Sequence, residues 1–188
     1  MIIKLIYRDG LDTVSFRKIS NESGWSLGSI QNFFGNQQSL LIFIFKIISE
    51  NGQKRMEKQN LFVNKIDFEE FINFALQLLP LDKEREIEFV AWTALVNKSL
   101  SNEDMRKVAH DNLLKNYEGI KQVFKLMLDS GIFKATLDIN KSTNEFYSFL
   151  EGLSQHSLLL RDYYNDKLLK DLVERFVKSN YLDKDLNN

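Results

Sequence analysis

Apolar residues recur at helical spacing along almost the whole chain, and no segment alternates convincingly between apolar and polar residues. This pattern predicts an all-α protein without a sheet, because a half-buried strand needs a period of two. Glycines, serines or asparagines suited to helix caps, and Pro80 divide the pattern into about nine helices. The predicted helices cover about 1–8, 16–23, 27–34, 37–58, 68–79, 83–99, 103–129, 143–161 and 167–181.

Two of these helices, 16–23 and 27–34, are only about eight residues long, and the tight turn Gly24-Trp25 separates them. Helices this short are marginal in water, so they must pack to persist. The apolar side chains expected to supply this packing are Val14, Phe16, Ile19, Trp25, Ile30, Phe34 and Leu41. The second short helix then keeps an outer face of small and amide side chains, which suits a recognition helix in the DNA major groove. On that face lie Ser26, Leu27, Ser29, Gln31 and Asn32.

An ordered series of short motifs runs through about 40 residues at this end of the chain. The motifs are Gly10-Leu11, Ser15-Phe16-Arg17-Lys18-Ile19-Ser20, Ser23-Gly24-Trp25-Ser26-Leu27-Gly28-Ser29-Ile30, Phe33-Phe34-Gly35-Asn36 and Leu40-Leu41. In order and spacing they resemble the DNA-binding signature of the TetR family of transcriptional regulators. Three further stretches resemble the branch of that family that contains the betaine-synthesis regulator BetI. They are Leu79-Pro80-Leu81-Asp82 before a Trp-bearing helix, Asp129-Ser130-Gly131, and Leu150-Glu151-Gly152-Leu153.

The resemblance implies a helix-turn-helix DNA-binding domain over residues 1–45 and a helical ligand-binding and dimerisation domain over 46–188. It also implies a double-stranded DNA operator as partner. The residues expected to contact DNA are Ser15, Lys18, Ser26, Leu27, Ser29, Gln31, Asn32 and Gln37.

The chain departs from the family pattern at three positions of this segment. Gln31 stands where the family has Tyr, Phe33 where it has Tyr or His, and Gln37 where it has a Lys that resembles a phosphate clamp. The family also has a further turn or more of chain, often basic, before the position of Met1. A neutral amide forms no charge-assisted bond and releases no counterion, so we expect weaker DNA affinity than that of a typical relative.

The last two predicted helices have more apolar surface than one neighbour needs. We therefore expect a homodimer with two-fold symmetry, in which these helices from both chains form a four-helix bundle, as the resemblance also implies. Gly152, Ser154 and Ser157 are small enough to let the helices approach closely. The alternative is that the same residues form a monomeric core. The expected interface residues are Phe149, Gly152, Leu153, Leu160, Leu169, Leu172 and Phe176.

The resemblance further implies a ligand cavity in the second domain. The aromatic content suits a small apolar effector or a cationic one held over ring faces. The alternative is that these aromatic side chains form plain core. The expected lining residues are Phe89, Trp92, Val96, Tyr117, Phe124, Phe146 and His156, whereas Glu84, Glu86 and Glu88 are expected to form a solvated face.

Composition narrows the function class. The chain has no cysteine, which excludes disulfides and thiolate sites, and no apolar run of the roughly 20 residues that a membrane span needs. With no signal peptide expected, these features favour a cytoplasmic protein without a membrane partner. No nucleophile elbow, phosphate-binding loop, dinucleotide motif or metal-ligand cluster stands out, so we expect no enzyme, cofactor or metal. Net charge is +3 over residues 1–58 and −4 over 59–188, which favours the N-terminal part as the partner of a polyanion.

The sequence therefore predicts a ligand-responsive transcriptional regulator of the TetR type. It would be a repressor that binds a palindromic operator as a dimer and is released by a small-molecule effector. A ligand-binding dimer of the same fold that no longer binds DNA remains an alternative, and a small-molecule enzyme is a more remote one.

Overall fold

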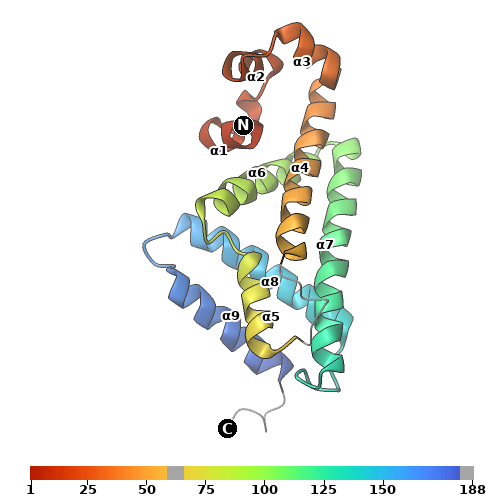
Figure 1. Cartoon of the computed structure of the whole chain (residues 1–188), viewed down its shortest axis with the longest axis vertical. Helices are drawn as coiled ribbons and strands as arrows, with labels where there is room; N and C mark the ends of the chain where they lie inside the picture. The colour runs from red at the N-terminus through yellow and green to blue at the C-terminus, as the bar shows by residue number, and fades with distance from the viewer. Residues whose placement is uncertain (59–65, 183–188) are drawn as a thin grey trace. The chain divides into compact units, whose positions relative to one another are not determined.

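The computed structural model describes residues 1–58 and 66–182 of the chain. Over this part it contains nine α-helices, one short 3₁₀ helix and no strand, which confirms the predicted all-α fold (Figure 1). The elements are α1 (Ile2–Asp9), η1 (Leu11–Thr13), α2 (Phe16–Ser23), α3 (Leu27–Phe34), α4 (Gln37–Glu57), α5 (Phe68–Gln77), α6 (Lys83–Ser99), α7 (Glu103–Asp129), α8 (Ile139–Leu159) and α9 (Asp166–Tyr181).

The predicted start of α8 is wrong by four residues. The Asp138 side chain accepts a hydrogen bond from the Lys141 backbone N–H at 3.1 Å, and this cap allows the helix to begin at Ile139. The 3₁₀ helix η1 was not predicted. Its turn is closed by the Thr13 hydroxyl, which donates to the Gly10 carbonyl at 2.9 Å.

Glycines in positive-φ conformations end both α2 and α3. Gly24 has φ 74° and ψ 0°, and its N–H donates to the Ser20 carbonyl at 3.2 Å. Gly35 has φ 70°. A residue with a Cβ loses about 1–2 kcal/mol in the left-handed region, so glycine lets the chain turn sharply on both sides of α3.

One compact unit of the chain comprises residues 1–53 and 83–113, and we call it unit 1. Within it α1 lies beside α6. Its apolar core joins the three short N-terminal helices to the first half of α4 and to α6. The fully or nearly fully buried side chains of this core include Leu5, Ile6, Val14, Ile19, Ile30, Leu40, Ile44, Phe45, Ala91 and Leu95.

The other compact unit, which we call unit 2, comprises residues 54–82 and the chain from 114 onward. Within it α5 lies beside α9, and an aromatic cluster fills the core. Phe124 packs against Phe146 with ring centroids 5.4 Å apart and against Tyr181 at 5.0 Å. The Tyr181 hydroxyl donates to the Ser142 carbonyl at 3.0 Å, so its buried polar atom is satisfied.

The two compact units do not coincide with the predicted division at residue 45. Unit 1 includes α4 as far as Gln53, all of α6 and the start of α7. The assignment of separate functions to residues 1–45 and 46–188 remains a prediction. Over the part of the chain that the structure describes, no helix combines the length and the hydrophobicity that a membrane span requires.

Alanine should destabilise the protein at Gly24 but not at Gly28. A Cβ on Gly24 would have nothing within 4 Å, so Gly24→Ala carries only the backbone strain of φ 74° and should lower the free energy of unfolding by about 1 kcal/mol. Gly28 lies inside α3, and a Cβ there makes an ordinary 3.9 Å contact with Ser26 Oγ. Gly28→Ala should leave stability unchanged or raise it by up to about 1 kcal/mol. Urea denaturation of both variants measures the difference, and a change of the same sign in both would contradict it.

Candidate functional site

Side-chain caps fix the starts of α2 and α3 where the sequence predicted them. The Ser15 hydroxyl accepts a hydrogen bond from the Lys18 N–H at 3.3 Å, and the Ser26 hydroxyl accepts one from the Ser29 N–H at 3.1 Å. Each cap satisfies a backbone donor that a helix start leaves open. Ser26 Oγ also lies 2.8 Å from Ser29 Oγ. Ser15 and Ser26 are exposed, but part of the hydrogen-bonding capacity of each is used within the chain.

The inner face of α3 is apolar, and its outer face carries polar side chains together with the exposed Phe33. Ile30 is 2% exposed, and the Phe34 ring stacks on Phe16 with centroids 6.2 Å apart. Leu27 is half-buried, so it is a less accessible candidate. The exposed candidates on α3 itself are Ser29, Gln31 and Asn32. Donors and acceptors of these types can contact base edges and phosphates.

Two other candidates, Lys18 and Gln37, have side chains engaged inside the chain. The Lys18 ammonium lies 2.6 Å from Asp9 Oδ2 and 3.2 Å from Thr13 Oγ1. The Gln37 amide donates to the Val14 carbonyl at 2.6 Å. The Gln37 amide nitrogen is therefore bound to the backbone just before α2. A phosphate would have to compete with the Val14 carbonyl for Gln37, and with Asp9 and Thr13 for Lys18.

An ionic chain ties α1 to α2. Arg8 contacts Asp9 at 2.8 Å and Glu22 at 2.5 Å, and Asp9 also contacts Lys18. Hydrogen bonds, first from Arg8 and then from Lys18, hold the pKa of Asp9 well below its ordinary value. The Asp9 carboxylate therefore stays ionised at neutral pH and keeps Lys18 paired.

Trp25 does not pack as the sequence predicted. Its side chain is 62% exposed, although it was expected to join the apolar face of the helix-turn-helix. Phe33 is 65% exposed, and its ring lies nearly perpendicular to that of Phe34 with centroids 4.8 Å apart. Val14, Ile19 and Ile30 fill the core of this segment without the indole.

The glutamates of α6 were predicted to form a solvated face, and for two of them this is wrong. Glu86 and Glu88 are each 5% exposed. Glu86 accepts a hydrogen bond from the Tyr7 hydroxyl of α1 and lies 3.0 Å from the Lys83 ammonium. Glu88 accepts one from the Asn51 amide of α4 at 2.6 Å. These carboxylates therefore join α6 to α1 and α4.

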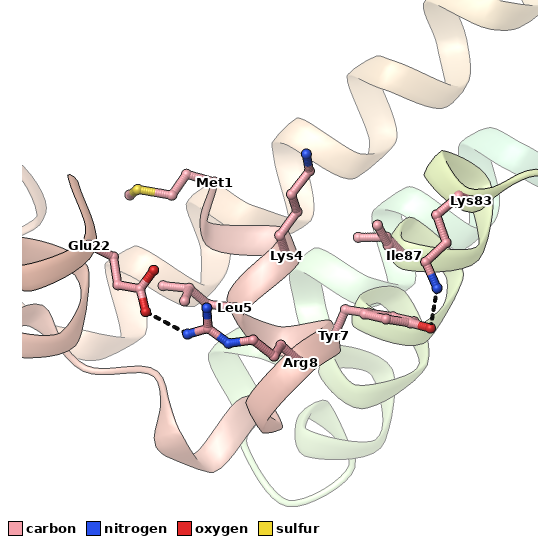
Figure 2. A pocket seen from close by; sticks show the side chains of 8 residues that line it. All are labelled: Met1, Lys4, Leu5, Tyr7, Arg8, Glu22, Lys83 and Ile87. Atoms are coloured by element: carbon pink, nitrogen blue, oxygen red, sulfur yellow. Dashed lines mark hydrogen bonds and ion pairs between the residues drawn. The ribbon is translucent and has the colours of Figure 1, made fainter.

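Figure 2 shows the groove beside Tyr7, where the tyrosine hydroxyl meets Lys83 and Arg8 meets Glu22. Lys83 donates to the Tyr7 hydroxyl at 2.5 Å, and this hydrogen bond, together with Glu86, raises the pKa of Lys83. The i, i+3 spacing of Lys83 and Glu86 was the one local signal in the sequence for this cluster. The groove is lined by Met1, Lys4, Leu5, Tyr7, Arg8, Glu22, Lys83 and Ile87.

The seven candidate ligand residues divide between the two compact units. Phe89, Trp92 and Val96 are half-buried residues of α6 in unit 1, where Trp92 meets Phe45 edge to face at 5.4 Å. The other four lie in unit 2.

Within unit 2, Phe124 and Phe146 are fully buried in the aromatic core, because neighbouring rings surround them. The structure therefore places these two in packed core, the alternative that the sequence left open. Tyr117 donates its hydroxyl to the Asn140 carbonyl at 2.9 Å. His156 is exposed.

The candidate dimer residues differ in how much of their surface the single chain leaves exposed. Leu153 and Leu169 are 6% and 3% exposed within the single chain, so they have little area left for a partner. Ser154 and Ser157 are also buried in their own chain. The residues that keep exposed surface are Phe149, Gly152, Leu160, Leu172 and Phe176, together with Leu159 and Tyr163. The Phe149 and Phe176 rings stack at 4.1 Å. We call this set the outer face of α8 and α9.

Comparison with known proteins shows similarity over nearly the whole chain. Residues 71–181 match the family described as "BetI-type transcriptional repressor, C-terminal". The HTH-type transcriptional regulator PksA of Bacillus subtilis (strain 168) is 24% identical over 176 residues, covering 94% of this chain and 84% of PksA.

Two solved structures with bound ligands share the fold. A protein from Saccharomonospora viridis in complex with choline has a TM-score of 0.83 at 18% identity, covering 97% of this chain and 94% of that one. The transcriptional regulator FadR from Bacillus subtilis in complex with stearoyl-CoA has a TM-score of 0.75 at 18% identity, covering 95% and 94%.

Removing the Tyr7 hydroxyl should destabilise the protein. Tyr7→Phe takes a donor from the buried Glu86 carboxylate and should lower the free energy of unfolding by about 1–3 kcal/mol. Ser39→Ala is the control, because that hydroxyl is exposed on α4, and it should change stability by less than about 0.5 kcal/mol. Denaturant unfolding compares the two, and equally small effects would show that the Tyr7–Glu86 contact does not stabilise unit 1.

Proposed function

The chain belongs to the TetR family of ligand-responsive transcriptional regulators, with a C-terminal part of the BetI type, and we propose that it represses its target genes by binding a palindromic operator as a homodimer. The observation that carries this proposal is α3, a short helix anchored by Ile30 and Phe34 whose outer face presents Ser29, Gln31 and Asn32. The DNA major groove admits an α-helix, and polar side chains on the face that enters it can contact base edges.

The outer face of α8 and α9 supports the dimer. Phe149 and Phe176 stack and remain partly exposed, and Leu159, Leu160 and Tyr163 are further exposed apolar side chains at the end of α8 and in the connection to α9. An apolar face of this kind on a soluble chain marks an association surface. Packing against its own copy would give a two-fold dimer, whose symmetry suits two half-sites about one helical turn apart.

The proposed effector is a small apolar or cationic compound. Choline, a small cation, is bound by one protein of similar fold and is the first probe, whereas stearoyl-CoA, bound by the other, is larger and anionic and serves as the contrasting probe. In this chain Trp92 on α6 contacts Phe45 on α4, and Phe43 of α4 contacts Phe34 of α3 at 5.2 Å. A ligand that displaces Trp92 would shift α4 through Phe45 and so change the position of α3. Coupling energies between sites in proteins are typically about 1–3 kcal/mol.

One observation favours the second candidate function, a ligand-binding dimer that does not bind DNA. No charged side chain lies between Ser26 and Gly35, and the side chains of Lys18 and Gln37 are engaged inside the chain. The proposal assigns the protein no catalytic activity.

Selection of duplexes from fragments of the source genome at low salt tests the proposal. We expect enrichment of a palindrome, and Asn32→Ala should weaken specific binding by roughly 1–3 kcal/mol because Asn32 faces outward from α3. Asn73→Ala, an exposed amide of α5, is the matched control and should bind normally. Choline or a long-chain acyl-CoA added to the bound duplex tests the release step. Enrichment of no sequence by the unsubstituted protein would favour the dimer that does not bind DNA.

Charge placed on the outer face of α8 and α9 should break the dimer. Leu160→Lys would bury an ammonium group in an apolar interface, so light scattering at micromolar concentration should give 22.1 kDa instead of twice that mass. Leu100→Lys is the control, since Leu100 is 67% exposed in the α6–α7 turn, and it should leave the dimer intact. A monomeric unsubstituted protein, or a dimeric Leu160→Lys variant, would count against this interface.

A further inference from the structure

The Trp25 backbone is held more firmly than its exposed side chain suggests. Its N–H donates to the Ser23 hydroxyl at 3.1 Å, and its carbonyl accepts from the Ser20 hydroxyl at 2.7 Å. Gly24 on one side is fixed by its left-handed turn, and Ser26 on the other caps α3. The indole therefore projects from a rigid turn at the start of the candidate recognition helix, while 62% of the side chain meets solvent.

Few cationic side chains near this turn are available to contact phosphates. The α3 segment has no charged side chain, Lys18 is paired with Asp9, and the Gln37 amide donates to Val14. Arg17 is an exposed cation on α2. Backbone affinity in DNA-binding proteins normally comes from several such cations. If this face binds DNA, uncharged donors and apolar surface must supply contacts that cations supply elsewhere.

An indole can supply both an uncharged donor and apolar surface. Its Nε1–H is a donor and never an acceptor, which suits an anionic phosphate oxygen. Its ring can cover the apolar surface of the adjoining deoxyribose. Because no cation is involved, such a contact releases no counterion, so it holds its strength as salt rises.

We propose that Trp25 is a DNA-contacting residue that donates its indole N–H to a backbone phosphate beside each half-site. This inference rests on the proposed operator binding. The DNA duplex would thus cover the exposed surface around Trp25, because that surface is continuous with the outer face of α3. The contact fixes where α3 enters the groove and adds affinity that does not depend on base sequence.

Binding of the selected duplex over a range of salt concentrations tests this proposal. Trp25→Phe keeps a ring but loses the donor, and we expect it to weaken binding by about tenfold, with Trp25→Ala at least as weak. The slope of log affinity against log salt should stay unchanged in both. Gln37→Lys is the contrasting variant and should steepen the slope by about 0.9 for each bound protomer. Leu100→Ala, another exposed apolar side chain of unit 1, should bind normally.

A tryptophan fluorescence measurement distinguishes loss of this contact from a folding defect. The chain has two tryptophans, so Trp92→Phe leaves Trp25 as the sole indole emitter. In that protein acrylamide should quench Trp25 strongly without DNA and much less at saturating duplex. Unchanged quenching at saturation, or a Trp25→Ala protein that binds as tightly as the unsubstituted one, would overturn the contact while leaving operator binding intact. If the unsubstituted protein binds no duplex, the proposed function and this contact both fail.

Discussion

The candidate DNA interface depends on the burial of one face of an eight-residue helix, because a helix that short does not persist alone in water. Ile30 and Phe34 supply that face, Ser26 caps the first turn, and Gly35 ends the helix in a conformation that other residues adopt at a cost. Since the inner face and both ends hold α3 in place, the side chains on its outer face need not contribute to folding. They are therefore free to serve a partner.

The same packing connects α3 to the α6 residues proposed to sense ligand. Phe43 and Phe45 lie two residues apart on α4, and they contact Phe34 of α3 and Trp92 of α6 respectively. The Tyr7 hydroxyl and the buried Glu86 tie α1 to α6 as well. Movement of α6 would thus reach the helix-turn-helix by an apolar contact and by a polar one. Packed side chains and hydrogen bonds of this kind are the contacts through which coupling between two sites travels.

Local signals in the sequence predicted the helix-turn-helix well, and long-range contacts explain what was missed. Ser15, Ser26 and Gly24 act on backbone groups within four residues, so the bounds of α2 and α3 could be predicted. Glu86 and Glu88 are buried by partners 79 and 37 residues away, which periodicity cannot reveal. Leu153 and Leu160 lie on one line of the predicted helix, yet Leu153 is buried in its own core and Leu160 is 55% exposed, because α8 ends at Leu159 whereas the pattern continued it to 161. The exposure of Trp25 likewise depends on which other side chains fill the core.

The central claim is that a symmetric pair of α3 helices binds the operator. A hydroxyl-radical footprint of the selected duplex, with the protein at saturation, tests it most directly. The account predicts two equivalent protected stretches related by two-fold symmetry and centred about one helical turn of DNA apart. A single protected stretch, or two whose separation does not fit one turn or a multiple of it, would contradict it.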